Sequence, residues 1–146
     1  MKTKLIFSLL FCTTFFWGFA QERMMIFDGK SKEHMYYVSE SDELVSVNKV
    51  EGQYTFAVLD DMSIFMAMDN EGIITTFDVS DHKFEKDPDI LTMFVTDDKN
   101  TESAVVINEE TMFLVISYDV NGRIELDRYE ITWMGFDDEL DTEGDK

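Results

Sequence analysis

The sequence predicts an all-β fold: an antiparallel meander of about eight to nine strands that closes as a small barrel or a strongly curved sheet. Apolar and polar residues alternate with a period of two through most of the chain, as in strands with one buried face. Short turns rich in Asp, Asn and Gly join these segments, and no convincing helical stretch is present. A β-sandwich is the alternative, because it uses the same alternation.

The clearest element is a long hairpin over residues 112–134. Asn121-Gly122 lies between two apolar-rich arms, and a type I′ turn needs a positive φ at both of its central residues. In the second arm the apolar side chains change parity between Leu126 and Tyr129. We expect a β-bulge near 127–128 to account for the change.

The other strands follow from alternation bounded by turn residues. In chain order they are residues 34–39, 44–50, 54–59, 63–68, 73–79, 90–96 and 103–107, with 24–27 as a short additional candidate. Asp28-Gly29 and Glu51-Gly52 are expected to end strands, and the charged segment 80–89 is expected to be the longest loop. Because the connections are short, neighbours in sequence are expected to be neighbours in the sheet.

Residues 1–20 are typical of a cleaved signal peptide. Lys2 and Lys4 precede an apolar run over 5–19, and small residues stand just before Gln21. A retained membrane anchor is the alternative, but the run is shorter than the roughly 20 residues that span a bilayer. We therefore expect a secreted or periplasmic protein with one all-β domain over 21–136 and a disordered acidic tail over 137–146.

The balance of charge limits the partners. The chain has 31 acidic and 12 basic residues, a net charge of −19. Nucleic-acid binding depends on Lys and Arg at the phosphates, and anionic membrane surfaces attract basic segments. We expect neither a nucleic-acid partner nor membrane insertion of the mature chain. A basic protein or calcium is compatible with this charge, and a solvated acidic surface is the simpler interpretation.

Methionines on one predicted strand suggest an apolar binding site. Met62, Ile64, Met66 and Met68 share one parity, and Phe77 belongs to the next strand. Adaptable thioether side chains suit the lining of an apolar cavity inside a barrel. Plain core filling is the simpler interpretation, and a Cu(I) site is a further alternative, since soft sulfur ligands select Cu(I).

A second candidate site is acidic. Asp78, Asp81, Glu85, Asp87 and Asp89 offer many oxygens over a short stretch, and Ca²⁺ takes six to eight oxygen ligands in flexible loops. A calcium site is therefore a candidate, and a solvated loop is the simpler interpretation, because acidic residues are abundant throughout the chain.

No catalytic motif stands out in the sequence. The only cysteine, Cys12, leaves with the leader, and His34 and His82 are the only histidines. The preferred interpretation is a small non-catalytic binding module, with an apolar small molecule as its ligand. An envelope or extracellular protein that binds a basic protein partner is the first alternative, and a carboxylate-dependent hydrolase is the second.

Overall fold

Eight antiparallel strands pair in chain order, and β1 pairs with β8 to close a barrel. The computed structural model describes residues 23–137. The strands are β1 (Met24–Val38), β2 (Glu43–Leu59), β3 (Ile64–Met68), β4 (Ile74–Glu85), β5 (Ile90–Thr96), β6 (Glu102–Asn108), β7 (Phe113–Val120) and β8 (Arg123–Phe136). The predicted all-β meander is confirmed, as a barrel and not a sandwich. The predicted leader, and the tail beyond residue 137, lie outside the described residues.

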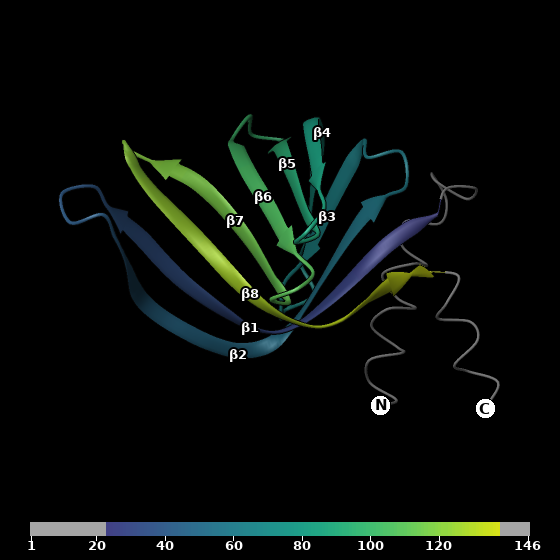
Figure 1. Cartoon of the computed structure of the whole chain (residues 1–146), viewed down its shortest axis with the longest axis horizontal. Helices are drawn as coiled ribbons and strands as arrows, with labels where there is room; N and C mark the ends of the chain where they lie inside the picture. Colours follow the sequence, from purple (N-terminus) through teal and green to yellow (C-terminus); the bar gives the residue numbers. More distant parts are fainter. Residues whose placement is uncertain (1–22, 138–146) are drawn as a thin grey trace.

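Two predicted strand ends are wrong, because Gly29 and Gly52 lie inside long strands. β1 and β2 pair almost continuously, with register shifts beside Gly29 and His34. A Cβ atom at Gly29 would lie 3.3 Å from the carbonyl oxygen of Glu130, and one at Gly52 would lie 3.0 Å from the Cβ of Asn70. These glycines therefore permit a close approach between chain segments. Figure 1 shows β1, β2 and β8 bending strongly beneath the other strands.

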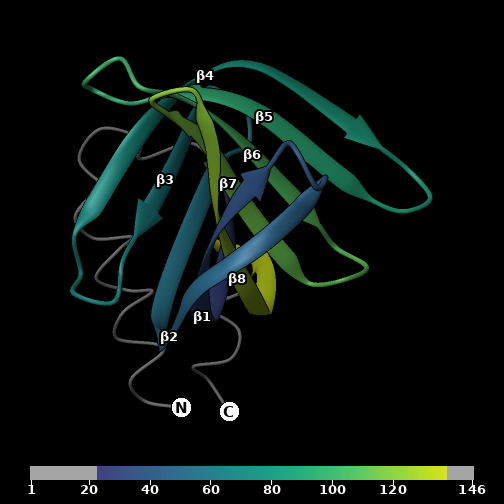
Figure 2. The same cartoon turned by 90° about the vertical axis from the view of Figure 1, so that its left-hand side faces the viewer.

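The predicted loop over 80–89 is also wrong, because most of it is strand. β4 continues through Glu85 and pairs with β5 after a register shift between Val79 and Asp81. Its second half is exposed, and the β4–β5 hairpin projects from the body of the barrel (Figure 2). A strand that faces water on both sides has no apolar alternation, so its charged sequence resembles that of a loop.

Side chains of Asp and Asn stabilise the turns. Asp61, Asp69, Asp97, Asn108 and Asp119 each accept a backbone N–H bond two to four residues further on. Such bonds imitate a backbone turn, which is why these residues favour connections. Part of the acidic surplus therefore has a structural role. The turn of the predicted hairpin is confirmed, with φ of 53° at Asn121 and 82° at Gly122.

The core fills the inside of the barrel with aromatic and aliphatic side chains. Its buried members are Phe27, Tyr54, Phe56, Val58, Phe65, Leu91, Met93, Val95, Val105, Ile107, Leu114, Ile116, Tyr129 and Ile131. Every strand except β4 contributes a buried residue, and Phe77 and Val79 of β4 pack against the cluster. Phe56 lies at its aromatic centre. Its ring centroid is 6.0 Å from that of Phe65 and 4.7 Å from that of Tyr129.

A second apolar cluster lies on the opposite, outer face of β1, β2 and β3. Cross-strand partners share a face, and the partners Ile26 and Ala57, then Ala57 and Met66, alternate with those that face the core. The buried members of this outer cluster are Met24, Ile26, Ala57, Leu59, Met66 and Met68. The first strands therefore have apolar side chains on both faces.

Candidate functional site: the mouth of the barrel

Alternate side chains of β8 point into the barrel, and they include both acidic and apolar residues. Glu125, Asp127, Tyr129 and Ile131 are all buried, while the residues between them are more exposed. The predicted bulge near 127–128 is wrong, because the β7–β8 register is unbroken there and the β1–β8 shifts lie beside Gly29. The change in apolar parity has another cause: the inner face changes from apolar to acidic toward the β7–β8 turn.

His34 on β1 lies between these two carboxylates. Its Nδ1 is 2.8 Å from Oδ1 of Asp127, and its Nε2 is 3.2 Å from Oε2 of Glu125. Lys32 approaches the other Asp127 oxygen at 3.4 Å, and the Tyr118 hydroxyl donates to that oxygen at 3.4 Å. Two strands thus bring together a network of charges that are far apart in the sequence.

Arg123 is the member of this network that is most exposed to solvent. Its guanidinium donates to Glu125 and lies 4.7 Å from the centroid of the Tyr36 ring. The hydrogen bonds from Arg123, opposed in part by desolvation, hold the pKa of the Glu125 carboxyl below its usual range. Glu125 therefore remains ionised beside His34 at neutral pH.

Next to this network the barrel opens into a cavity of about 270 Å³, which we call the mouth cavity. Its aromatic walls are Tyr54, Phe56, Phe77, Tyr118 and Tyr129. Three carboxylates also border it: Asp127 from β8, Asp69 from the β3–β4 turn and Asp97 from the β5–β6 turn. A concave, mostly apolar site with a few polar groups is the usual form of a small-molecule site.

Two tyrosine hydroxyls in this cavity have no hydrogen-bond partner among the residues that the structure describes. Tyr54 and Tyr129 are only 4% and 7% exposed. Their rings contact one another edge to face at 5.2 Å, but neither hydroxyl has a hydrogen-bond partner within residues 23–137. No fully enclosed side-chain oxygen in that range lacks a partner, so both phenol oxygens must open on the cavity. Buried polar groups normally find partners, and these two are available to a ligand or water.

The electrostatics of the cavity favour neutral phenols. Burial raises the pKa of Tyr54 and Tyr129, and the carboxylates of Asp69 and Asp127 raise both further. Burial, followed by the charges of Asp127 and Glu125, raises the pKa of Tyr118 to about 12. All three hydroxyls therefore keep their protons at neutral pH and can both donate and accept hydrogen bonds.

Stability is expected to fall at alkaline pH, partly because of Tyr118. The unfolded chain releases this proton near pH 10 and the folded chain near pH 12. The stabilisation from Tyr118 is therefore complete below about pH 10 and is lost as the pH rises through about 12. Urea unfolding of the parent protein and Tyr118→Phe across this range should show a shallower fall for the variant. Parallel curves would contradict the assignment.

The structure divides the methionine set between two faces of the barrel. Ile64, Met66 and Met68 lie in or against the outer cluster, whereas Met62 and Phe77 pack against the inner core. Met62 has a φ of 59° and lies in the β2–β3 turn, so the strand alternation does not extend to it. Met68 and Phe77 also border the mouth cavity, which brings part of the predicted set to this site.

The acidic set is spread along β4 and the turn that follows. Asp78, Asp81 and Glu85 are strand residues, and Asp87 and Asp89 lie between β4 and β5. Glu85 pairs with Lys83 at 2.7 Å. Within the described chain, no three His, Cys, Asp or Glu side chains are grouped so that they could hold a metal ion. Calcium binding at this set stays a prediction.

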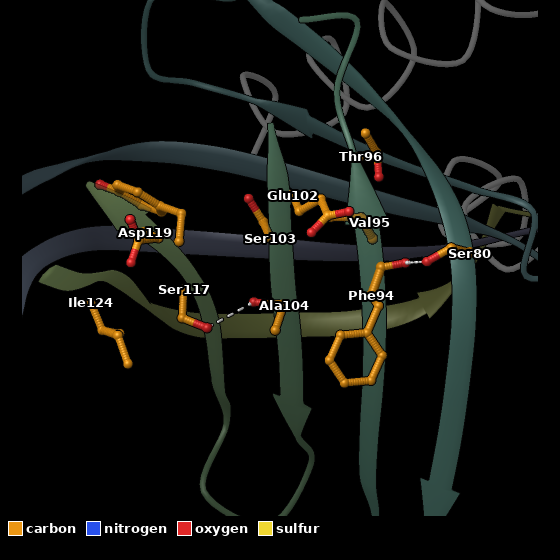
Figure 3. A pocket seen from close by; sticks show the side chains of 11 residues that line it. Ser80, Phe94, Val95, Thr96, Glu102, Ser103, Ala104, Ser117, Asp119 and Ile124 are labelled. Atoms are coloured by element: carbon orange, nitrogen blue, oxygen red, sulfur yellow. Dashed lines mark hydrogen bonds between the residues drawn. The ribbon is translucent and has the colours of Figure 1, made fainter. Parts of the chain in front are cut away.

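A second hollow, of about 340 Å³, lies on the outer face of β5, β6 and β7. Figure 3 shows Phe94 and Ile124 on either side of it, with Ala104 and Ser117 between them. The Ser80 hydroxyl donates to the carbonyl of Phe94 at 3.1 Å and the Ser117 hydroxyl to that of Ala104 at 3.4 Å. These two hydroxyls are already paired, unlike those of Tyr54 and Tyr129 in the mouth cavity.

Sequence reasoning missed the residues that build the mouth. Tyr54, Tyr118 and Tyr129 are not among the residues predicted for a site, and the association of His34 with Asp127 is not expected at all. The signal was available in the strict alternation of Glu125, Asp127, Tyr129 and Ile131.

No match was found to any known protein family, curated protein or solved structure. In residues 23–137 no helix is long and apolar enough to cross a membrane.

Proposed function

We propose that this chain is a small exported, non-catalytic binding protein that holds a small molecule in the mouth cavity. The observation that carries the proposal is that the hydroxyls of Tyr54 and Tyr129, within aromatic walls, have no hydrogen-bond partner in the described part of the chain. Both hydroxyl oxygens open on the cavity, since no fully enclosed side-chain oxygen of residues 23–137 lacks a partner. A ligand that hydrogen-bonds to these hydroxyls takes the place of water there and also gains apolar contact.

The arrangement of His34 supports binding over catalysis. Both of its ring nitrogens face carboxylates, Asp127 on one side and Glu125 on the other. A general base that activates a hydroxyl nucleophile needs one nitrogen directed at that hydroxyl. We assign His34 a structural role: it contacts two carboxylates on the inner face of β8. Export follows from the leader expected over residues 1–20.

The proposal is tested by blocking the mouth. Residues 21–146, purified from the native host's own secreted or periplasmic fraction, are examined by native mass spectrometry and by uptake of a hydrophobic dye. We expect an additional non-covalent mass or dye uptake in the parent protein and a loss of both in Thr75→Trp. Thr75 borders the cavity, and a tryptophan side chain would occupy its opening.

The neighbouring residue provides a matched control. Thr76 lies on the same strand but pairs with Met66 on the outer face, so Thr76→Trp adds the same bulk outside the barrel. It should leave binding unchanged. Equal loss in both variants, or no binding by the folded parent protein, would contradict the proposal.

A further inference from the structure

The mouth cavity carries negative charge without a basic side chain. Asp69, Asp97 and Asp127 border it, and none of the described residues around it is Lys, Arg or His. Asp69 and Asp97 accept backbone N–H bonds from their own turns. Such bonds orient a carboxylate but leave its net charge in place. The carboxylates at the two turns therefore set a negative potential at the opening.

Asp127 differs, because Lys32 and His34 already approach it. His34 and Lys32 contact its two oxygens from β1 and are not among the residues that border the cavity. The charge of Asp127 is thus partly compensated by Lys32, whereas Asp69 and Asp97 form no ion pair within residues 23–137. The net charge of −19 adds a long-range field that draws cations toward the protein.

The remaining groups of the cavity also suit a cation. Aromatic faces attract ammonium groups, and Tyr54, Tyr118 and Tyr129 supply three such rings. The free hydroxyls of Tyr54 and Tyr129 can accept N–H bonds. An anion could take hydrogen bonds from the same hydroxyls but would meet the carboxylates, and a neutral ligand would gain nothing from their charge.

We infer that the ligand of the mouth cavity is a small organic cation: a protonated amine on a compact apolar body. Its ammonium group lies among the carboxylates and the hydroxyls of Tyr54 and Tyr129, and its apolar body contacts the aromatic walls. A volume of about 270 Å³ is near the lower end of ordinary ligand pockets, so the body is no larger than about one ring. This inference rests on the proposed function and specifies its ligand class.

Three probes of nearly equal shape separate charge from size. Benzylamine is cationic at neutral pH, benzyl alcohol is neutral and benzoate is anionic. Isothermal titration calorimetry on the folded protein should give an affinity for benzylamine about tenfold higher than for benzyl alcohol, and still lower affinity for benzoate. Added salt should reduce this advantage, because it screens the carboxylates at the opening.

A variant that removes one carboxylate charge tests whether the preference for a cation arises at the mouth cavity. Asp69→Asn keeps the oxygen that accepts the turn bonds and removes one charge. It should weaken benzylamine several-fold and leave benzyl alcohol unchanged. Asp61→Asn makes the same change in the β2–β3 turn, where the residue does not border the cavity, and should alter neither affinity. Tyr129→Phe should weaken both amine and alcohol, since it removes a hydroxyl that each can use.

The outcomes distinguish this inference from the proposed function. If benzyl alcohol or benzoate binds as tightly as benzylamine and Thr75→Trp blocks that binding, the cavity binds ligands but the preference for a cation is overturned. Equal effects of Asp69→Asn and Asp61→Asn would overturn it as well. The absence of binding by all three probes also overturns it, while a co-purified molecule in the mass spectrum would still support the proposed function.

Discussion

Phe56→Ala is expected to lower the free energy of unfolding by about 3–5 kcal/mol, the range for removing a large aromatic side chain from a close-packed core. Phe56 is 1% exposed and contacts rings on two other strands, Phe65 of β3 and Tyr129 of β8. Its loss removes buried apolar area and leaves a hole that the barrel cannot collapse around. A domain of this size has about 5–15 kcal/mol of stability, so the variant should be near the limit of folding.

Phe94→Ala is the matched control. Phe94 is 51% exposed on the outer face of β5, and its removal should change stability by less than about 1 kcal/mol. Urea unfolding followed by circular dichroism compares the two variants. Phe56→Leu, which keeps most of the volume, covers the case in which Phe56→Ala does not fold. A cost for Phe56→Ala no larger than that for Phe94→Ala would contradict the barrel core described above.

The fold could be predicted because the strands that cover the core keep a clean alternation. Residues 90–96 and 103–107 pair with each other and enclose one side of the barrel almost as predicted. The Asn121-Gly122 turn fixes the β7–β8 register by its backbone alone. Short connections then make a meander the natural order of strands.

The strand boundaries that were predicted wrongly depend on contacts between residues that are distant in the sequence. Gly29 and Gly52 look like strand ends because glycine is common in turns, yet each lies where another segment approaches its backbone closely. Local sequence does not reveal that Glu130 will lie beside Gly29. The prediction for the exposed half of β4 failed for a related reason. Pairing with β5 keeps this segment extended, and its own sequence pattern does not indicate a strand.

The site was harder to predict than the fold because its polar residues lie on the inner face. If only apolar side chains are assumed to point inward, Glu125 and Asp127 are placed on the outer face. That placement requires a β-bulge in β8, and the structure has none there. Their burial becomes favourable only when β1 supplies His34 and Lys32 from about ninety residues away. The division of the predicted methionine set could not be foreseen for a similar reason. Met66 belongs to the outer cluster, whereas Phe77 packs against the inner core. Alternation within one strand cannot show that these two side chains lie on opposite faces of the sheet.

Asp127→Ala is expected to lower the free energy of unfolding by about 1–3 kcal/mol. The change leaves His34, Lys32 and Tyr118 without an oxygen that each now contacts, and a buried group that loses its partner pays its desolvation cost. Loss of one partner of a fully buried ion pair costs about 3–5 kcal/mol. The smaller value is expected because the His34 and Lys32 side chains are 25% and 37% exposed, so water compensates them in part.

A competing effect acts in the opposite direction. Asp127 and Glu125 are like charges on the same face of one strand, and removal of one relieves their repulsion. Asp127→Asn separates the two contributions, because it abolishes the repulsion while keeping one oxygen, which serves either His34 or Tyr118. If pairing dominates, urea unfolding should rank the parent protein above Asp127→Asn and Asp127→Ala lowest, with exposed Asp98→Ala near the parent. If both Asp127 variants were as stable as the parent, repulsion would balance pairing, and the network would then be kept for the ligand site it borders.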